Sequence, residues 1–400
     1  MQILYIIQAE VCAKLRIMNR IVFVWLICIC PFSLKSQSKK SINIIYTSDA
    51  HYGIFREHFH GDTNVPAYIV NGAMIAEMNL LPGTKLPADR GVDAGQAIGN
   101  IDYLVESGDI ANRMEPPYQS ASISWQQFEN DYKDHLHLTD QRGKRTPLLL
   151  IPGNHDISNA IGYGKKMIPA KDPAAMAGIY NMMLKPEVPI NATSFNYTDD
   201  KIHYSRDIGG VHFLFINLWP DSAERVWMDG DLKKVPVQIP VIIFAHDPPA
   251  CDPKHFNNPA APGMFPAGSK FENLTEETYK EGNAPQKGPH STDLEQRGWV
   301  AFLKKHPNIK AYFHGHSNWN EFYVYHGPDN DINLPVFRVD SPMKGSISAT
   351  DETKLSFQLI TLDPEKQLLT VRECFWNAEP GNPKSPVLFG MSKTINLKCF

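Results

Sequence analysis

LLLIPGNHD, at residues 148–156, is an apolar run that stops at a polar cluster. Residues 148–151 are continuous and apolar, which is typical of a short strand buried on both faces of a sheet. Gly153-Asn154-His155-Asp156 follows at the point where that strand would end. The rest of the chain repeats this unit, in which a buried strand leads directly into side chains that can bind or react.

Four other apolar runs end in the same way. The runs and their clusters are residues 42–46 before Asp49-Ala50-His51, residues 101–105 before Gly108-Asp109, residues 241–245 before His246-Asp247, and residues 309–313 before His314 and Gly315-His316-Ser317-Asn318. Helices are predicted between some runs, around residues 122–138 and 294–305, and this alternation indicates an α/β sheet. Sites in such sheets form outside the carboxyl ends of the strands, where all five clusters stand.

The bulk composition excludes some partners. Four hundred residues, 42% of them hydrophobic and 20% charged, suit a globular protein of one large domain or two ordinary ones. The net charge is −4 and no basic run indicates a nucleic-acid groove. We therefore expect no nucleic-acid polymer as a partner.

The N-terminus resembles a targeting segment. Met18-Asn19-Arg20 gives a short positive start, and residues 21–32 are almost purely apolar but too few to span a bilayer comfortably. We predict a signal peptide at about residues 18–36, preceded by an upstream extension, and a secreted or periplasmic mature protein without a membrane span. The alternative is a membrane-anchored N-terminus.

The mature chain is predicted to be one domain, residues 37–400, with long insertions at about 53–100 and 247–297. Strands at residues 355–362 and 367–374, within a C-terminal segment at 352–376, are expected to form sheet edges of the same domain. Three cysteines remain after residue 36, so at most one intramolecular disulfide can form, and Cys374–Cys399 is the candidate.

The clusters carry the donors that two adjacent metal ions need. Two divalent cations about 4 Å apart can hold a phosphate and generate hydroxide near neutral pH. Asp49 and His51 suit one ion, and Asp109 is the natural bridging carboxylate. The remaining donors are an amide oxygen and two imidazoles, from Asn154, His246 and His316.

In this order, the clusters resemble the motifs of the calcineurin-like metallophosphoesterase superfamily over about residues 41–320. That pattern is D-x-H, G-D, G-N-H-[DE], H and G-H-x-H. The resemblance implies a β-sandwich of two mixed sheets flanked by helices, and a phosphoester hydrolase with a dinuclear metal centre and a bridging hydroxide. It further implies that Asp49, His51 and Asp109 bind the first ion, that Asp109, Asn154, His246 and His316 bind the second, and that His155 is catalytic.

The chain departs from the family pattern at the last histidine. Asn318 stands there if Gly315 aligns with the motif glycine, and its amide oxygen could still bind the first ion. The alternative register uses His314 and His316 as the pair.

A second comparison concerns the residues after Asp109. By resemblance to the protein phosphatase branch, Asn112 and Arg113 are candidate substrate-binding residues, with Arg113 as a forked donor to phosphate. The alternative is that Arg113 is structural. Purple acid phosphatases place a tyrosine iron ligand where Asn112 stands, so an Fe(III)–tyrosinate site is not expected.

The motifs leave the substrate open. A small organic phosphate ester is expected, either a monoester or a diester, and the mixed oxygen and nitrogen donors suit Mn, Zn or Fe. A hypothesis from another class is a non-catalytic binding protein that retains the metallophosphoesterase fold.

Overall fold

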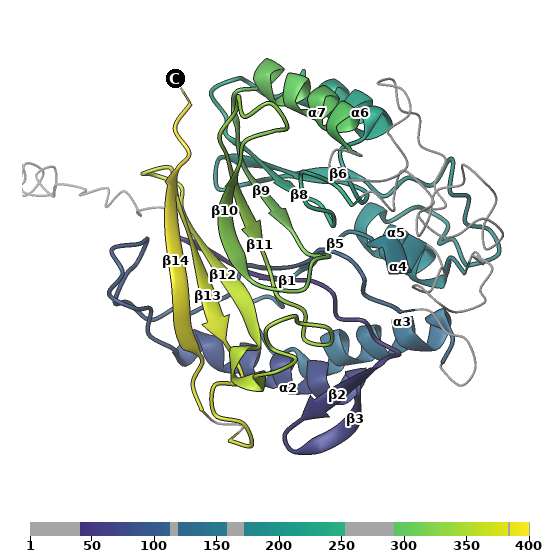
Figure 1. Cartoon of the computed structure of the whole chain (residues 1–400), viewed down its shortest axis with the longest axis vertical. Helices are drawn as coiled ribbons and strands as arrows, with labels where there is room; N and C mark the ends of the chain where they lie inside the picture. Colours follow the sequence, from purple (N-terminus) through teal and green to yellow (C-terminus); the bar gives the residue numbers. More distant parts are fainter. Residues whose placement is uncertain (1–40, 113–118, 158–171, 253–291, 383–384, 400) are drawn as a thin grey trace, which may run out of the picture. The chain divides into compact units, whose positions relative to one another are not determined.

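Two mixed β-sheets of six strands each form the framework of the chain in the computed structural model (Figure 1). The structure describes residues 41–112, 119–157, 172–252, 292–382 and 385–399. The predicted signal peptide, Arg113 and most of the second insertion lie outside these residues.

The first sheet is built around the strand that precedes Asp49. In spatial order it contains β14 (Leu388–Asn396), β13 (Leu368–Phe375), β12 (Ser356–Asp363), β1 (Ile42–Thr47), β4 (Tyr103–Glu106) and β5 (Leu148–Leu150). β1 pairs in parallel with β4 and antiparallel with β12. The carboxyl ends of β1, β4 and β5 therefore meet at one edge.

The second sheet carries the two histidine clusters. In spatial order it contains β10 (Glu321–Tyr325), β11 (Leu334–Arg338), β9 (Ile309–His314), β8 (Val241–Phe244), β7 (Val211–Phe215) and β6 (Tyr204–Ile208). Its four central strands are parallel, and β10 and β6 are antiparallel edges.

Successive side chains of β8 pack in turn against the first sheet and against the helices. Phe244 faces the first sheet, where its ring lies 5.2 Å from that of Tyr46 on β1 and 4.7 Å from that of Phe313 on β9. Ile243, on the other face, belongs to the cluster that contains Trp299 of α7 (Asp293–Lys305) and Met228 of α6 (Ser222–Leu232). A strand that is covered on both faces has a nearly continuous apolar sequence. The predicted sandwich of two mixed sheets with flanking helices is confirmed.

Four further helices precede β6 in the sequence. They are α2 (Ala67–Leu80), α3 (Ala121–Asn130), α4 (Asn154–Ile157) and α5 (Ala174–Leu184). The predicted helix at 122–138 is α3 followed by a π-helical turn, Asp131–His135. The first insertion folds into α2 and a hairpin of β2 (Phe55–Phe59) and β3 (Asp62–Pro66). No helix of the described residues is both long and apolar enough to cross a bilayer.

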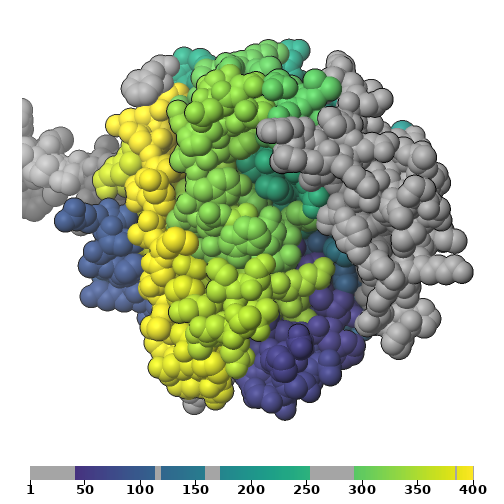
Figure 2. All heavy atoms as spheres, in the orientation of Figure 1, coloured from purple at the N-terminus to yellow at the C-terminus, as the bar shows by residue number. Residues whose placement is uncertain are grey.

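The C-terminal strands differ from the prediction of two sheet edges. β12 is an interior strand, buried along almost its whole length between β1 and β13. The edge is β14, whose residues are mostly exposed and therefore lack the apolar run that marks a buried strand. In the space-filling view, the yellow C-terminal segment runs along the margin of the visible face (Figure 2).

The predicted Cys374–Cys399 disulfide is wrong, because both thiols are free. Cys374 on β13 lies opposite Phe389, whereas β14 runs on until Asn396 lies opposite Leu368, at the other end of β13. Six residues of strand separate these two ends, about 20 Å. A disulfide tolerates a Cα separation of only about 7 Å.

Candidate metal centre

The five polar clusters converge where the carboxyl ends of β1, β4, β5, β8 and β9 meet. Backbone hydrogen bonds join the loops that carry them: the Asp49 amide donates to the Gly108 carbonyl at 2.9 Å, and the Gly315 amide donates to the His246 carbonyl at 3.1 Å. The site is therefore assembled from both sheets, and every cluster that the sequence singled out reaches it.

Five of the candidate ligands have left-handed backbone conformations. Asp49, His51, Asp109, His316 and Asn318 have φ values of 58°, 43°, 52°, 63° and 62°. Each such conformation costs a non-glycine residue of the order of 1 kcal/mol and persists only where the surrounding structure enforces it. These backbone conformations turn several short loops so that their side chains point to one place.

Two glycines allow the loops to approach so closely. A Cβ on Gly153 would collide with the Asp109 backbone and would lie 2.8 Å from Cε1 of His246. A Cβ on Gly315 would collide with Ser48 and with the carboxylate of Asp49. Any side chain at these two positions would push candidate ligands apart.

Asp109 stands between two groups of donors. Its Oδ1 lies 3.4 Å from Nε2 of His246, whereas its Oδ2 lies 3.7 Å from Nε2 of His51 and 3.9 Å from Nε2 of His155. Two ligands of one ion, each about 2.1 Å from it, are separated by about 3 to 3.5 Å. The carboxylate can thus serve two ions, one on each oxygen.

The group on the Oδ1 side contains two imidazoles and an amide. Oδ1 of Asn154 lies 3.0 Å from Nε2 of His246 and 3.1 Å from Nδ1 of His316. The outer ring nitrogens are held by protein acceptors: Nδ1 of His246 donates to the Ser107 carbonyl at 2.9 Å, and Nε2 of His316 lies 3.0 Å from Oδ2 of Asp252. Such outer contacts fix the tautomer and turn the inner nitrogen lone pairs toward a metal.

The group on the Oδ2 side has buried acceptors without protein partners. Among the described residues, Oδ1 of Asp49 is buried and accepts no hydrogen bond, and neither ring nitrogen of His51 makes one. Oδ1 of Asp49 lies 3.5 Å from Nε2 of His51. Buried polar atoms normally have partners. A divalent cation would satisfy these oxygen and nitrogen donors together, so the residues fit a metal ion.

His314 is turned away from this group. Its Nδ1 donates to the Gly315 carbonyl at 2.9 Å and its Nε2 lies 2.9 Å from the Tyr323 hydroxyl. Burial and the Arg338 cation lower the pKa of His314 to about 3. The Nδ2 of Asn318, by contrast, donates to the His316 carbonyl at 2.9 Å, which leaves its Oδ1 available. His314 is thus engaged by Tyr323, whereas Oδ1 of Asn318 has no hydrogen-bond partner among the described residues.

The electrostatics of the site favour cations. Burial alone would raise the pKa of Asp109, but His246 and His155 lower it well below its ordinary value. Burial alone would lower the pKa of His246, but Asp109 and Asp49 outweigh it and raise this pKa to about 10. The two aspartates thus create a field that holds positive charge at the strand ends.

The calcineurin-like phosphoesterase profile matches residues 42–320, the region that carries all five clusters. The chain belongs to this family. Its members are metal-dependent phosphoester hydrolases, which agrees with the donor groups around Asp109.

The remaining comparisons are distant. The search of curated proteins gave no significant match. A dimetal phosphatase from Danio rerio is 10% identical, with a TM-score of 0.49 over 89% of this chain and 99% of the other. A predicted phosphoesterase from Streptococcus pneumoniae is 10% identical (TM-score 0.30; 89% and 98% covered), and a Vps29 variant from Entamoeba histolytica is 9% identical (TM-score 0.29; 89% and 100% covered).

Lys344 reaches the centre of this phosphoesterase from outside the matched region. Its Nζ lies 3.3 Å from Nε2 of His155. The Ser341 hydroxyl accepts from the Lys344 amide at 3.0 Å and donates to the Asp49 carbonyl at 2.9 Å, which ties the loop after β11 to the loop after β1. Arg56 on β2 holds the same loop through the Pro342 carbonyl at 2.9 Å. No motif signals this lysine, because 189 residues separate it from His155.

The residues after Asp109 are only partly described. Asn112 is buried beside the phosphoesterase centre, and its amide donates to the Tyr52 carbonyl at 2.8 Å. Arg113 lies outside the described residues. Asp156 was not predicted to have a role. Its carboxylate accepts from the amides of Gly153 and Ala111, each at 2.9 Å, and so locks the loop after β5 to the loop after β4.

Proposed function

We propose that this chain is a dinuclear phosphoesterase that hydrolyses small organic phosphate esters and prefers monoesters to diesters. The observation that carries the proposal is the bridging position of Asp109, whose two oxygens face different donor groups. Asp49, His51, Asp109 and Asn318 would hold one divalent ion, and Asp109, Asn154, His246 and His316 would hold the other. Bound there, such ions supply Lewis acidity and a water of lowered pKa.

His155 would protonate the leaving oxygen. Its amide donates to Oδ1 of Asp109 at 2.8 Å, which places its ring 5.2 Å from that of His51. The side chain of His155 is 12% exposed, whereas that of His51 is fully buried. An imidazole at the border between the donor groups and solvent can meet a substrate oxygen and exchange its proton with water.

Lys344 supports the preference for monoesters. A monoester dianion carries one more negative charge than a diester, so a cation beside the reacting group stabilises it more. The backbone of the lysine is held by the Ser341 hydroxyl, which in turn donates to the Asp49 carbonyl, so its loop is fixed beside the candidate metal ligands. The mixed nitrogen and oxygen donors suit Mn, Zn or Fe.

The test measures metal content together with hydrolysis of p-nitrophenyl phosphate and bis(p-nitrophenyl) phosphate. We expect two metal ions per wild-type chain, and in Asp109→Asn a loss of metal and a roughly thousandfold loss of both activities. Asp329→Asn, which removes a surface carboxylate paired with Arg297 at 2.8 Å, is the matched control and should retain both. A wild-type protein with fewer than two metals and no activity on either ester would refute the proposal.

We also propose that the chain is exported through its N-terminal segment, with cleavage near Ser36-Gln37. The support is the positive start followed by a short apolar run. Mass spectrometry of the exported protein should find an N-terminus close to Gln37. An intact N-terminus on an exported or cell-associated protein would contradict this.

A further inference from the structure

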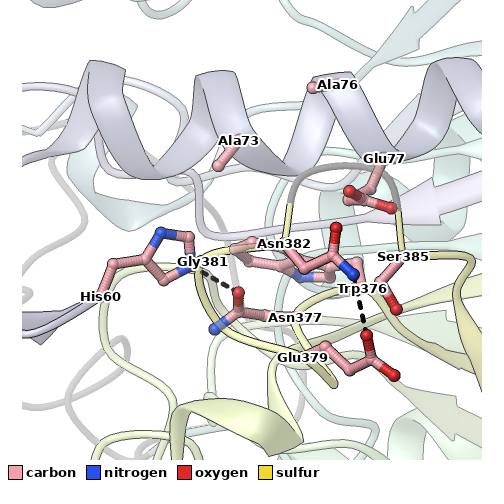
Figure 3. A pocket seen from close by; sticks show the side chains of 10 residues that line it. All are labelled: His60, Ala73, Ala76, Glu77, Trp376, Asn377, Glu379, Gly381, Asn382 and Ser385. Carbon is pink, nitrogen blue, oxygen red and sulfur yellow. Dashed lines mark hydrogen bonds between the residues drawn. The ribbon is translucent and has the colours of Figure 1, made fainter.

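A cavity lies between α2 and the segment that follows β13 (Figure 3). The space that it offers a ligand is about 50 Å³, which suits a molecule of a few heavy atoms. Glu77 projects into it from the helix, and Trp376 lies on the opposite side. A nucleotide or a peptide would be too large for this space, so the cavity suits a small molecule.

Glu77 is an unusual residue for this position. It is 5% exposed on the buried side of α2, and its Oε2 accepts no hydrogen bond from the described residues. Burial raises the pKa of Glu77 to about 7. A buried carboxyl without a partner is destabilising unless something else neutralises it, because its charge is removed from water without compensation.

Trp376 offers a second polar atom without a partner. The residue is 4% exposed, and its Nε1 donates to no acceptor among the described residues. A buried indole N–H normally finds an acceptor. The indole also presents an aromatic face, which attracts organic cations.

The remaining lining residues add negative rather than positive charge. Glu379 contributes a second carboxylate, and no lysine or arginine is among the described residues of the lining. The His60 ring lies 2.6 Å from Oδ1 of Asn377 and stacks on Phe59 with ring centroids 3.8 Å apart, so it does not neutralise Glu77. The cavity therefore presents a negatively charged acceptor, an indole N–H donor and an aromatic wall.

The cavity is separate from the metal centre. The start of α2 adjoins the centre, because Nδ2 of Asn71 donates to the Ala50 carbonyl at 2.8 Å. Glu77 lies ten residues beyond Ala67, the first residue of the helix, which is about 15 Å along its axis.

We propose that this cavity binds a small organic ammonium ion that also carries an oxygen acceptor, as an amino alcohol does. The ammonium group pairs with Glu77 against the face of Trp376, and the oxygen accepts from Nε1 of Trp376. This inference rests on the fold of α2 and the segment after β13, and it is independent of the proposed hydrolytic function.

The experiment is calorimetric titration of the full-length protein at pH 8 with ethanolamine, ethylammonium and ethylene glycol. Wild type should bind ethanolamine in the millimolar range, ethylammonium a few-fold more weakly, and ethylene glycol not at all. Glu77→Gln, which keeps the shape of the side chain, should weaken ethanolamine binding at least tenfold. Trp376→Phe should reduce the affinity for ethanolamine to that for ethylammonium. Asp49→Asn, which alters the metal centre only, should bind as wild type does.

Three results would overturn the proposal. They are no binding of ethanolamine to wild type, equal binding to Glu77→Gln, or equal binding of ethylene glycol. The last comparison uses wild type alone, so it holds even if a variant fails to fold.

Discussion

Replacement of Lys344 by glutamine removes one positive charge from the proposed reaction site and retains most of the side chain. Nζ lies 3.3 Å from Nε2 of His155, so a phosphoryl group between the metal ligands and His155 would have its phosphorus about 4 Å from this cation. At an effective dielectric constant of about 20, a unit charge at that distance contributes about 4 kcal/mol. Lys344 is partly exposed, and water entering in its place should reduce the loss to about 1.4 kcal/mol per unit of substrate charge, a factor of ten.

The expected result is a change in the ratio between two substrates. Since a diester carries one negative charge and a monoester dianion two, kcat/KM should fall about tenfold for bis(p-nitrophenyl) phosphate and about a hundredfold for p-nitrophenyl phosphate. The assay is initial-rate kinetics on both esters with metal content measured in parallel. Lys344→Arg, which keeps the charge, should recover part of the monoester rate.

Lys366→Gln is the matched control. Lys366 lies in the turn between β12 and β13, where its Nζ is 3.0 Å from Oδ2 of Asp363. Because Ile42 pairs with Leu362, this turn is at the opposite end of β1 from Asp49, and the substitution should change neither rate. The reasoning is refuted if Lys344→Gln lowers both esters by the same factor or leaves both unchanged while two metals remain bound.

Three further results are expected from the structure. Burial raises the pKa of Glu77 to about 7 in the folded protein, so its ionisation opposes folding and lowers stability as the pH rises from about 4.5 to 7. Glu77→Gln should make this fall smaller, and in chemical denaturation it should be more stable than wild type by roughly 1–2 kcal/mol at pH 8 but equal to it at pH 4. The gain is smaller than the full shift implies because water in the cavity screens the charge. In the native protein, a thiol reagent should modify the partly exposed Cys399 quickly and the buried Cys374 only after unfolding, and rapid labelling of both would contradict the burial. Gly153→Ala should abolish activity and lower the free energy of unfolding by about 1–3 kcal/mol. The control is Gly83→Ala, whose added Cβ meets no atom within 4 Å and should change neither activity nor stability. An active Gly153→Ala variant would show that the two loops can separate without loss of function.

The strands that the sequence predicts correctly are those buried on both faces. All six residues of β1 and all four of β8 are buried, and their sequences are accordingly mostly apolar. β14 and the β2–β3 hairpin are largely exposed and carry no such pattern, so they were not predicted. The strand β12 was predicted as a sheet edge because its sequence shows that it is buried but does not show which strands lie beside it.

Local sequence patterns are enough to identify the residues at the ends of the buried strands. A ligand two to four residues beyond a strand is a local feature, and parallel strands bring such ends together in any α/β sheet. Asp49, Asp109, Asn154, His246 and His316 therefore reach one place, as their positions predict.

Features that depend on contacts between distant segments become visible in the folded protein and not in the local sequence. The contact of His314 with the Tyr323 hydroxyl depends on the loop between β9 and β10, and the separation of Cys374 from Cys399 depends on the register of β13 and β14. Lys344 meets His155 across 189 residues because Ser341 ties its loop to Asp49. Local patterning records whether a residue is buried, but it does not record what lies against it, and the chemistry of this site depends on both.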